Sequence, residues 1–281
     1  MREKIDMYDN LAHFYDMYTG DLDREALAAF LEERFAKFGN KGLKGIASSP
    51  AERGGKTNKN SSAKNTCGAP ENGSDISSST LVIDVGCGTG KLTVLLAEKG
   101  YDMTGLDLSP EMLEIASGLG YEKGVGVLWL CQDMREMDTF GSYAAMYCLE
   151  DGVNHMTEDG DLGVFLGNAR NFIDEGGLLI FDFLSDKYFS AAAGKGVFFE
   201  DGDDGTCVWT GEYDGRLMTY DIICYSPDDC GAYERYDDTV CELALEPEKV
   251  RTELEKNGFE ILELFESEAD PGRYYVTAKR K

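Results

Sequence analysis

The chain has 281 residues, 42% of them hydrophobic, and a formal net charge of -26. A surface this acidic repels phosphate backbones and anionic headgroups, so we expect neither nucleic acid nor membranes as partners. The length and apolar fraction suit one large domain with an insertion, or two small domains.

None of the eight cysteines forms a CxxC pair or a Cys/His spacing typical of metal sites. Cys87, Cys131 and Cys148 lie in apolar, strand-like stretches, where a free thiol acts as a small hydrophobic side chain. We therefore expect no disulfide framework, no metal centre and a cytoplasmic location. The first residues carry no apolar signal core, and no stretch approaches the roughly 18 apolar residues of a membrane span.

The first predicted unit, residues 1–38, is helical from about Tyr8 to Phe38, because leucine and phenylalanine recur three or four residues apart with charges between them. Residues 39–80 contain few large apolar side chains. Such a composition cannot bury enough surface to offset the entropy cost of ordering, so we expect a flexible, low-complexity insertion.

Alternating strand and helix patterns follow. Strands are expected at about 81–85, 102–106, 125–131, 144–149 and 178–183. Ser109, Pro110 and Glu111 have the residue types of a helix start, and Gly176-Gly177 is expected to end a long helix near Asp174. The alternation predicts an α/β fold, a doubly wound Rossmann-like sheet with helices on both faces.

The pattern changes after Ser185. Residues 186–245 predict a small antiparallel β insertion, with strands near 206–210, 218–224 and 233–236. Residues 246–281 return to the main domain, which begins at residue 81, with a helix after Pro247 and two last strands. Four aromatic residues of the insertion are candidates for a substrate-cavity wall or for its apolar face: Trp209, Tyr213, Tyr220 and Tyr236.

The stretch from Asp84 to Thr93 places three glycines between an apolar strand and a helix. A phosphate-binding P-loop is excluded, because Val85 stands where its first glycine is required and Leu92 where Ser or Thr is required. A dinucleotide loop matches only in part, since Gly90 follows Gly88 by two residues rather than three. A tight turn without a ligand is the remaining alternative.

Ligands of open α/β sheets bind beyond the carboxyl ends of the strands. Asp107, after the second strand, can accept hydrogen bonds from two ribose hydroxyls, or it caps the next turn. Asp133 can accept from an adenine amino group while Met134 packs on the ring, or the two are a solvated acid and a core methionine. Leu149 ends the fourth strand.

The glycine loop and the two acids resemble, in order and separation, the class I S-adenosylmethionine-dependent methyltransferases over Leu81–Phe183. The segment Tyr8–Asp16 is similar to the N-terminal segment of a bacterial small-molecule branch of that family, related to sugar-amine N-methyltransferases and glycine N-methyltransferase. The resemblance implies S-adenosyl-L-methionine as cofactor, a small-molecule acceptor, a lid at residues 1–38 and a substrate side at residues 186–245. The implied cofactor contacts are Tyr15, Asp84, Gly86, Cys87, Gly88, Gly90, Asp107, Leu108, Asp133, Met134 and Leu149.

Methyl transfer from a sulfonium is an in-line displacement in which alignment of the reactants can contribute about 7–11 kcal/mol. His155, after the fourth strand, is the candidate for orienting or deprotonating the acceptor, and His13 is a second candidate; a structural role is the alternative for both. Relatives often carry His and Arg where this chain has Val240 and Leu243, so the identity of the acceptor does not transfer.

Two other functions stay open, a nicotinamide-dependent oxidoreductase and a non-catalytic S-adenosylmethionine-binding protein. The acceptor atom (nitrogen, oxygen or carbon) and the oligomeric state (monomer or homodimer) are open as well.

Overall fold

The computed structural model describes residues 12–18, 22–40, 43, 81–193, 195–202, 205–227 and 232–281. Most of the predicted insertion at 39–80 lies outside these residues, as do positions 8–11 of the N-terminal segment.

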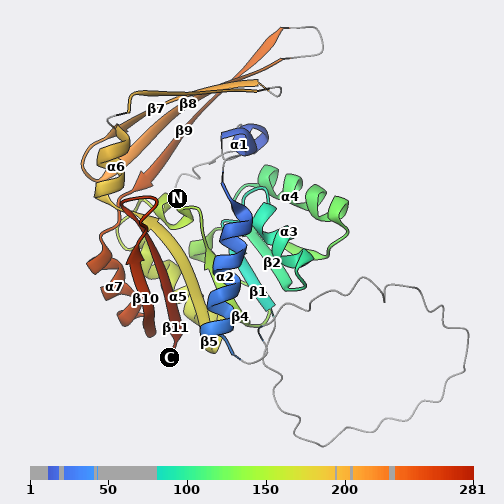
Figure 1. Cartoon of the computed structure of the whole chain (residues 1–281), viewed down its shortest axis with the longest axis vertical. Helices are drawn as coiled ribbons and strands as arrows, with labels where there is room; N and C mark the ends of the chain where they lie inside the picture. The colour runs from blue at the N-terminus through green and yellow to red at the C-terminus, as the bar shows by residue number, and fades with distance from the viewer. Residues whose placement is uncertain are drawn as a thin grey trace, which may run out of the picture.

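A seven-stranded sheet forms the centre of the molecule, in the order β10-β11-β5-β4-β1-β2-β3 (Figure 1). Neighbouring strands from β3 to β5 run parallel, whereas β11 is antiparallel to both β5 and β10. This arrangement confirms the predicted Rossmann-like α/β fold. The strands are β1 (Leu81–Val85), β2 (Asp102–Asp107), β3 (Val127–Cys131), β4 (Tyr143–Cys148), β5 (Ile173–Leu184), β10 (Phe259–Glu266) and β11 (Arg273–Arg280).

Helices cover both faces of the sheet. Neighbouring residues Val82 and Ile83 are both fully buried, but they belong to different apolar clusters. Val82 packs with α2 (Arg24–Phe38) and α3 (Lys91–Glu98), and Ile83 with α5 (Asp161–Phe172) and α7 (Pro247–Lys256). Successive side chains of a strand point to opposite faces, which is why β1 reads as a continuous apolar run.

Local capping explains α4 (Pro110–Lys123). Ser109 is its N-cap and accepts a hydrogen bond from the Met112 amide, while Gly124 closes the other end in the left-handed conformation. The predicted helix start at Ser109 is confirmed, and α4 packs against α3, β2 and β3.

The predicted N-terminal helical segment is divided into two helices, and one predicted helix end is wrong. The N-terminal segment forms two helices, α1 (Ala12–Tyr18) and α2, and Asp23 caps the second by accepting from the Ala26 amide. Gly176-Gly177 does not end a helix: α5 ends at Phe172, and both glycines lie within β5, where the pairing with β4 shifts in register. A glycine pair inside a strand thus marks an irregularity in the pairing rather than a helix stop.

The insertion is confirmed as an antiparallel sheet, in the order β6-β7-β8-β9. It also contains two unpredicted elements, α6 (Asp186–Ala193) and β6 (Val197–Gly202). The other strands are β7 (Gly205–Tyr213), β8 (Leu217–Pro227) and β9 (Tyr233–Leu243). In Figure 1 this sheet projects from the end of the main sheet nearest α1.

The expectation of free thiols only is wrong at one pair, because Cys207 and Cys224 form a disulfide. They lie directly opposite each other on β7 and β8, a relationship that appears only once the strands pair. Cys87, Cys131 and Cys148 are free, as predicted.

Within the described part of the chain, no helix combines the length and the apolar character needed to cross a membrane.

Candidate functional site

A cavity of about 130 Å³ lies beyond the carboxyl ends of β1, β2 and β4. Every predicted cofactor contact except Gly90 lines it, and so does the catalytic candidate His155. Residues at four strand ends, far apart in the sequence, are thus brought around one space, where α/β folds bind their ligands. Sequence reasoning missed several other lining residues, among them Arg24, Met112 and Gln132.

The three glycines of the loop differ in the contacts that their missing side chains allow. All have positive φ, 73° at Gly86, 52° at Gly88 and 73° at Gly90, a conformation that side chains disfavour. A Cβ at Gly88 would lie 3.6 Å from the ring of Tyr15, which stands over the loop. A Cβ at Gly90 would lie 2.7 Å from the Ala116 Cβ atom and 2.8 Å from the Trp129 ring. Gly90 therefore allows close packing behind the cavity instead of lining it.

Asp107, at the end of β2, joins two parts of the site. Its carboxylate accepts hydrogen bonds from the Gly88 amide at 2.8 Å and from the Ser109 amide at 3.0 Å. Burial raises its pKa, and these amides act in the opposite direction. Asp107 thus fixes the turn through these two amides, and its carboxylate still lines the cavity. Capping of the turn and binding of a ribose are therefore compatible roles for this residue.

The Asp133 carboxylate forms a salt bridge with Arg135. Its carboxylate receives the Arg135 guanidinium, with Nη2 at 2.6 Å and Nε at 2.9 Å, and Arg135 also contacts Asp161 at 2.8 Å. Asp133 still lines the cavity beside Met134, but much of its hydrogen-bonding capacity is used within the protein.

Asp84, at the end of β1, is deeply buried and accepts a hydrogen bond from the Thr93 hydroxyl. Burial raises its pKa to about 7, against the effect of the Thr93 hydrogen bond. Asp84 thus links β1 to α3 behind the glycine loop.

Helix α1 lies over the glycine loop. Asp16 accepts from the Thr89 hydroxyl at 2.9 Å and pairs with Lys91 at 2.9 Å, while Tyr15 lines the cavity. The side chain of His13, the second histidine candidate, lies outside what the structure describes.

The opposite wall follows β4. Glu150 and Asp151 both have positive φ, 61° and 53°, which is costly for residues other than glycine and is often seen at functional sites. The short helix η2 (Gly152–His155) comes next and ends in His155. Burial lowers the pKa of His155, so its imidazole is neutral near pH 7.

Asn154 holds this wall in place. Fully buried, it accepts a hydrogen bond from the Leu184 amide and donates to the Leu243 carbonyl at 2.7 Å. The strands β5 and β9 are thereby joined to η2, which places Glu242, the residue before Leu243, near His155. Sequence reasoning missed both Asn154 and Glu242, because nothing in their local sequence distinguishes them from other polar residues.

A second cavity lies between η2 and the insertion sheet, lined by Trp209, Tyr220 and Val240 together with Asp151 and Glu242. Of the four aromatic candidates, Trp209 and Tyr220 line it, whereas Tyr213 and Tyr236 do not. His155 lines the first cavity, and Asp151 and Glu242 line the second. A side-chain atom of His155 lies within 4.8 Å of a carboxylate oxygen of each, so the two cavities adjoin.

The chain is similar to known methyltransferases in both sequence and structure. Residues 82–177 match the family model described as a methyltransferase domain. The chain is 24% identical over 260 residues to a protein of Geobacillus sp. (strain WCH70) named Putative methyltransferase GWCH70_2453, covering 92% of this chain and 90% of that protein.

Two solved structures share the fold. One is an S-adenosylmethionine-dependent methyltransferase from Clostridium acetobutylicum ATCC 824, with a TM-score of 0.75, 23% identity and coverage of 97% of this chain and 98% of that one. The other is CalS10, an amino pentose methyltransferase from Micromonospora echinaspora, with a TM-score of 0.64, 18% identity and coverage of 95% and 96%. The match over residues 82–177, the fold and the cavity at the glycine loop together identify a methyltransferase domain with the fold of the S-adenosylmethionine-dependent methyltransferases.

Proposed function

We propose that the chain transfers the methyl group of S-adenosylmethionine to a small molecule held in the second cavity. The observation that carries this proposal is the meeting of the two cavities at His155, Asp151 and Glu242. A cofactor in the first cavity with its sulfonium toward His155 would present the methyl group to an acceptor in the second.

The cofactor contacts follow from the groups that line the first cavity. Ribose hydroxyls would donate to Asp107, and the adenine ring would lie near Met134 and Asp133. The amides at the start of α3 and the glycine loop suit the cofactor's carboxylate, because the first turn of a helix has unpaired N–H groups and the positive end of its dipole. Tyr15 would cover the cofactor, with α1 acting as a lid.

The chemistry asks for alignment and exclusion of water more than for acid catalysis, because the sulfonium leaves as a neutral thioether. An acceptor lone pair attacks the methyl carbon, the C–S bond breaks, and its electron pair goes to sulfur. His155, at the junction of the cavities, would orient the acceptor or receive its proton.

The proposal is tested in two steps. Titration calorimetry with S-adenosylmethionine and, separately, with NAD decides which cofactor binds; binding of NAD alone would contradict the proposal. Transfer of an isotope-labelled methyl group into fractionated metabolites then separates an enzyme from a non-catalytic binder. Label found only in a macromolecular fraction would rule out a small acceptor.

A further inference from the structure

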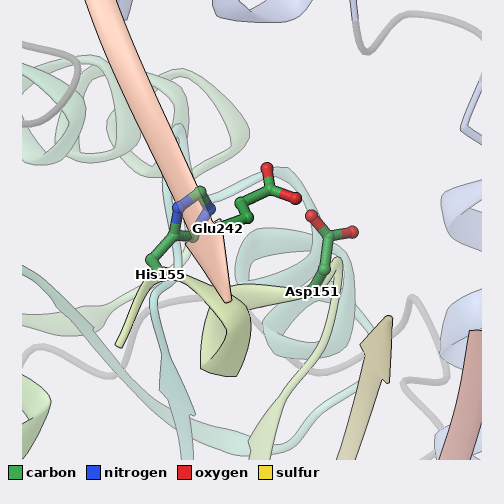
Figure 2. Close-up of side chains that lie close together, drawn as sticks. All are labelled: Asp151, His155 and Glu242. Carbon is green, nitrogen blue, oxygen red and sulfur yellow. The ribbon is translucent and has the colours of Figure 1, made fainter. Parts of the chain in front are cut away.

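Three potential metal ligands converge at the junction of the two cavities. Asp151 and His155 lie at the two ends of η2, and Glu242 approaches from β9 (Figure 2). One ligand atom from each residue lies within 4.8 Å of the others. Two carboxylates and an imidazole form the type of ligand set that binds divalent first-row metal ions, with positions left open for a substrate.

Glu242 is the independent observation that calls for a cation. Its side chain is buried, with 7% exposure, and it lines the second cavity. Among the described residues, no hydrogen bond or salt bridge to its carboxylate is found. A buried carboxylate in this position is costly unless a cation or a proton accompanies it.

The nearby arginine is already occupied. Arg273 pairs with Asp151 at 2.9 Å, with Asp270 at 2.8 Å and also with Asp182. The Arg273 guanidinium thus contacts three carboxylates before Glu242 is counted, and a further cationic side chain, Lys195, lines the second cavity. Asp151 uses only Oδ1 in its contact with Arg273, so its other oxygen is available to an ion.

His155 makes the kind of backbone hydrogen bond that is typical of metal-binding histidines. Its imidazole hydrogen-bonds to the backbone of Cys241, the residue before Glu242. Histidine ligands typically donate one ring N–H to a carbonyl or carboxylate, which fixes the ring and directs the other nitrogen at the metal. Bonds of about 2.0–2.2 Å to the ion require the three ligand atoms to move closer together.

We propose that Asp151, His155 and Glu242 bind a divalent metal ion that holds the methyl acceptor through an oxygen atom. This step rests on the proposed function. The acceptor hydroxyl would coordinate the ion, and coordination would lower the pKa of that hydroxyl. The hydroxyl proton would then pass to water in the second cavity. The oxygen then attacks the methyl carbon, and the C–S electron pair goes to sulfur. His155 in this arrangement is a ligand and not the base.

The test is Mn²⁺ binding to metal-stripped protein, followed by electron paramagnetic resonance without cofactor or acceptor. We expect wild type to bind one ion, Glu242→Gln to bind it more than about tenfold more weakly, and Glu248→Gln to match wild type. Glu248 is a matched control, since it is an exposed acid in the first turn of α7. Mn²⁺ should also raise the melting temperature of wild type but not of Glu242→Gln.

A wild-type protein that binds no Mn²⁺, or a Glu242→Gln protein that binds it equally well, overturns the inference. Calorimetry with S-adenosylmethionine on the same samples separates the two proposals. Cofactor binding without Mn²⁺ binding refutes the metal site alone, and Mn²⁺ binding without cofactor binding refutes the proposed function.

Discussion

The Asp107 carboxylate accepts a hydrogen bond from the Gly88 amide across 2.8 Å, which fastens the end of β2 to the glycine loop that follows β1. Two neighbouring strand ends are thereby held in one geometry before any ligand enters. A single side chain shapes the loop and presents an acceptor to the cavity.

Replacing Asp107 should weaken cofactor binding. Asp107→Ala removes the acceptor for both backbone amides and for the ribose, and hydrogen bonds to charged groups contribute about 1.5–3 kcal/mol each. We expect S-adenosylmethionine to bind roughly a hundredfold more weakly, and Asp107→Asn, which keeps one acceptor oxygen, to lose about tenfold. Calorimetry measures both; an unchanged dissociation constant in Asp107→Ala would refute the ribose assignment.

Tyr15 is expected to act through its ring. It stands over Gly88, where a Cβ would lie 3.6 Å away. Tyr15→Ala should weaken cofactor binding about tenfold, equivalent to about 1.4 kcal/mol, and Tyr15→Phe should keep most of the affinity. Equal affinities for wild type and Tyr15→Ala would mean that α1 does not cover the cofactor.

Alanine at Gly90 tests the close packing behind the cavity. Gly90→Ala combines a positive φ with contacts of 2.7 and 2.8 Å to Ala116 and Trp129, so we expect a loss of more than about 2 kcal/mol in the free energy of unfolding. Gly118, inside α4, has open space around its Cβ position. Gly118→Ala should therefore be stabilising by about 0.5–1 kcal/mol. Urea denaturation compares the two, and similar stabilities would contradict the packing role.

The buried Asp84 should make stability fall as pH rises. Its pKa is about 7 in the folded protein against 3.8 as the ordinary value, so between these pH values the unfolded chain loses a proton that the folded chain keeps. The free energy of unfolding therefore decreases across this window, by up to about 4 kcal/mol, and the loss is constant above pH 7. Asp84→Asn should lack this component. Denaturation of both ligand-free proteins from pH 4.5 to 7.5 tests it; parallel pH profiles would show that Asp84 ionises normally.

Much of the fold could be read from local patterns. The run Leu81–Val85 predicted a buried strand because successive side chains meet helices on both faces, and Ser109 predicted a helix start through its capping hydroxyl. The helix end predicted at Gly176 was wrong because glycine suits both a helix end and an irregular strand. Only the pairing of β5 with β4 distinguishes these two structures.

The amino-acid sequence by itself determined the proposed cofactor end of the site, since its glycines and acids follow consecutive strands whose carboxyl ends must share one edge of a parallel sheet. The tertiary structure alone decided the proposed acceptor end. Glu242 comes from β9 and Arg273 from β11, elements far along the chain from η2. The approach of Glu242 to Asp151 and His155 depends on how the insertion folds back onto the main sheet, whereas the approach of Arg273 to Asp151 depends on the pairing of β11 with β5. The Cys207–Cys224 pair has the same origin, because cross-strand neighbours are defined by register, a long-range property that no local spacing encodes.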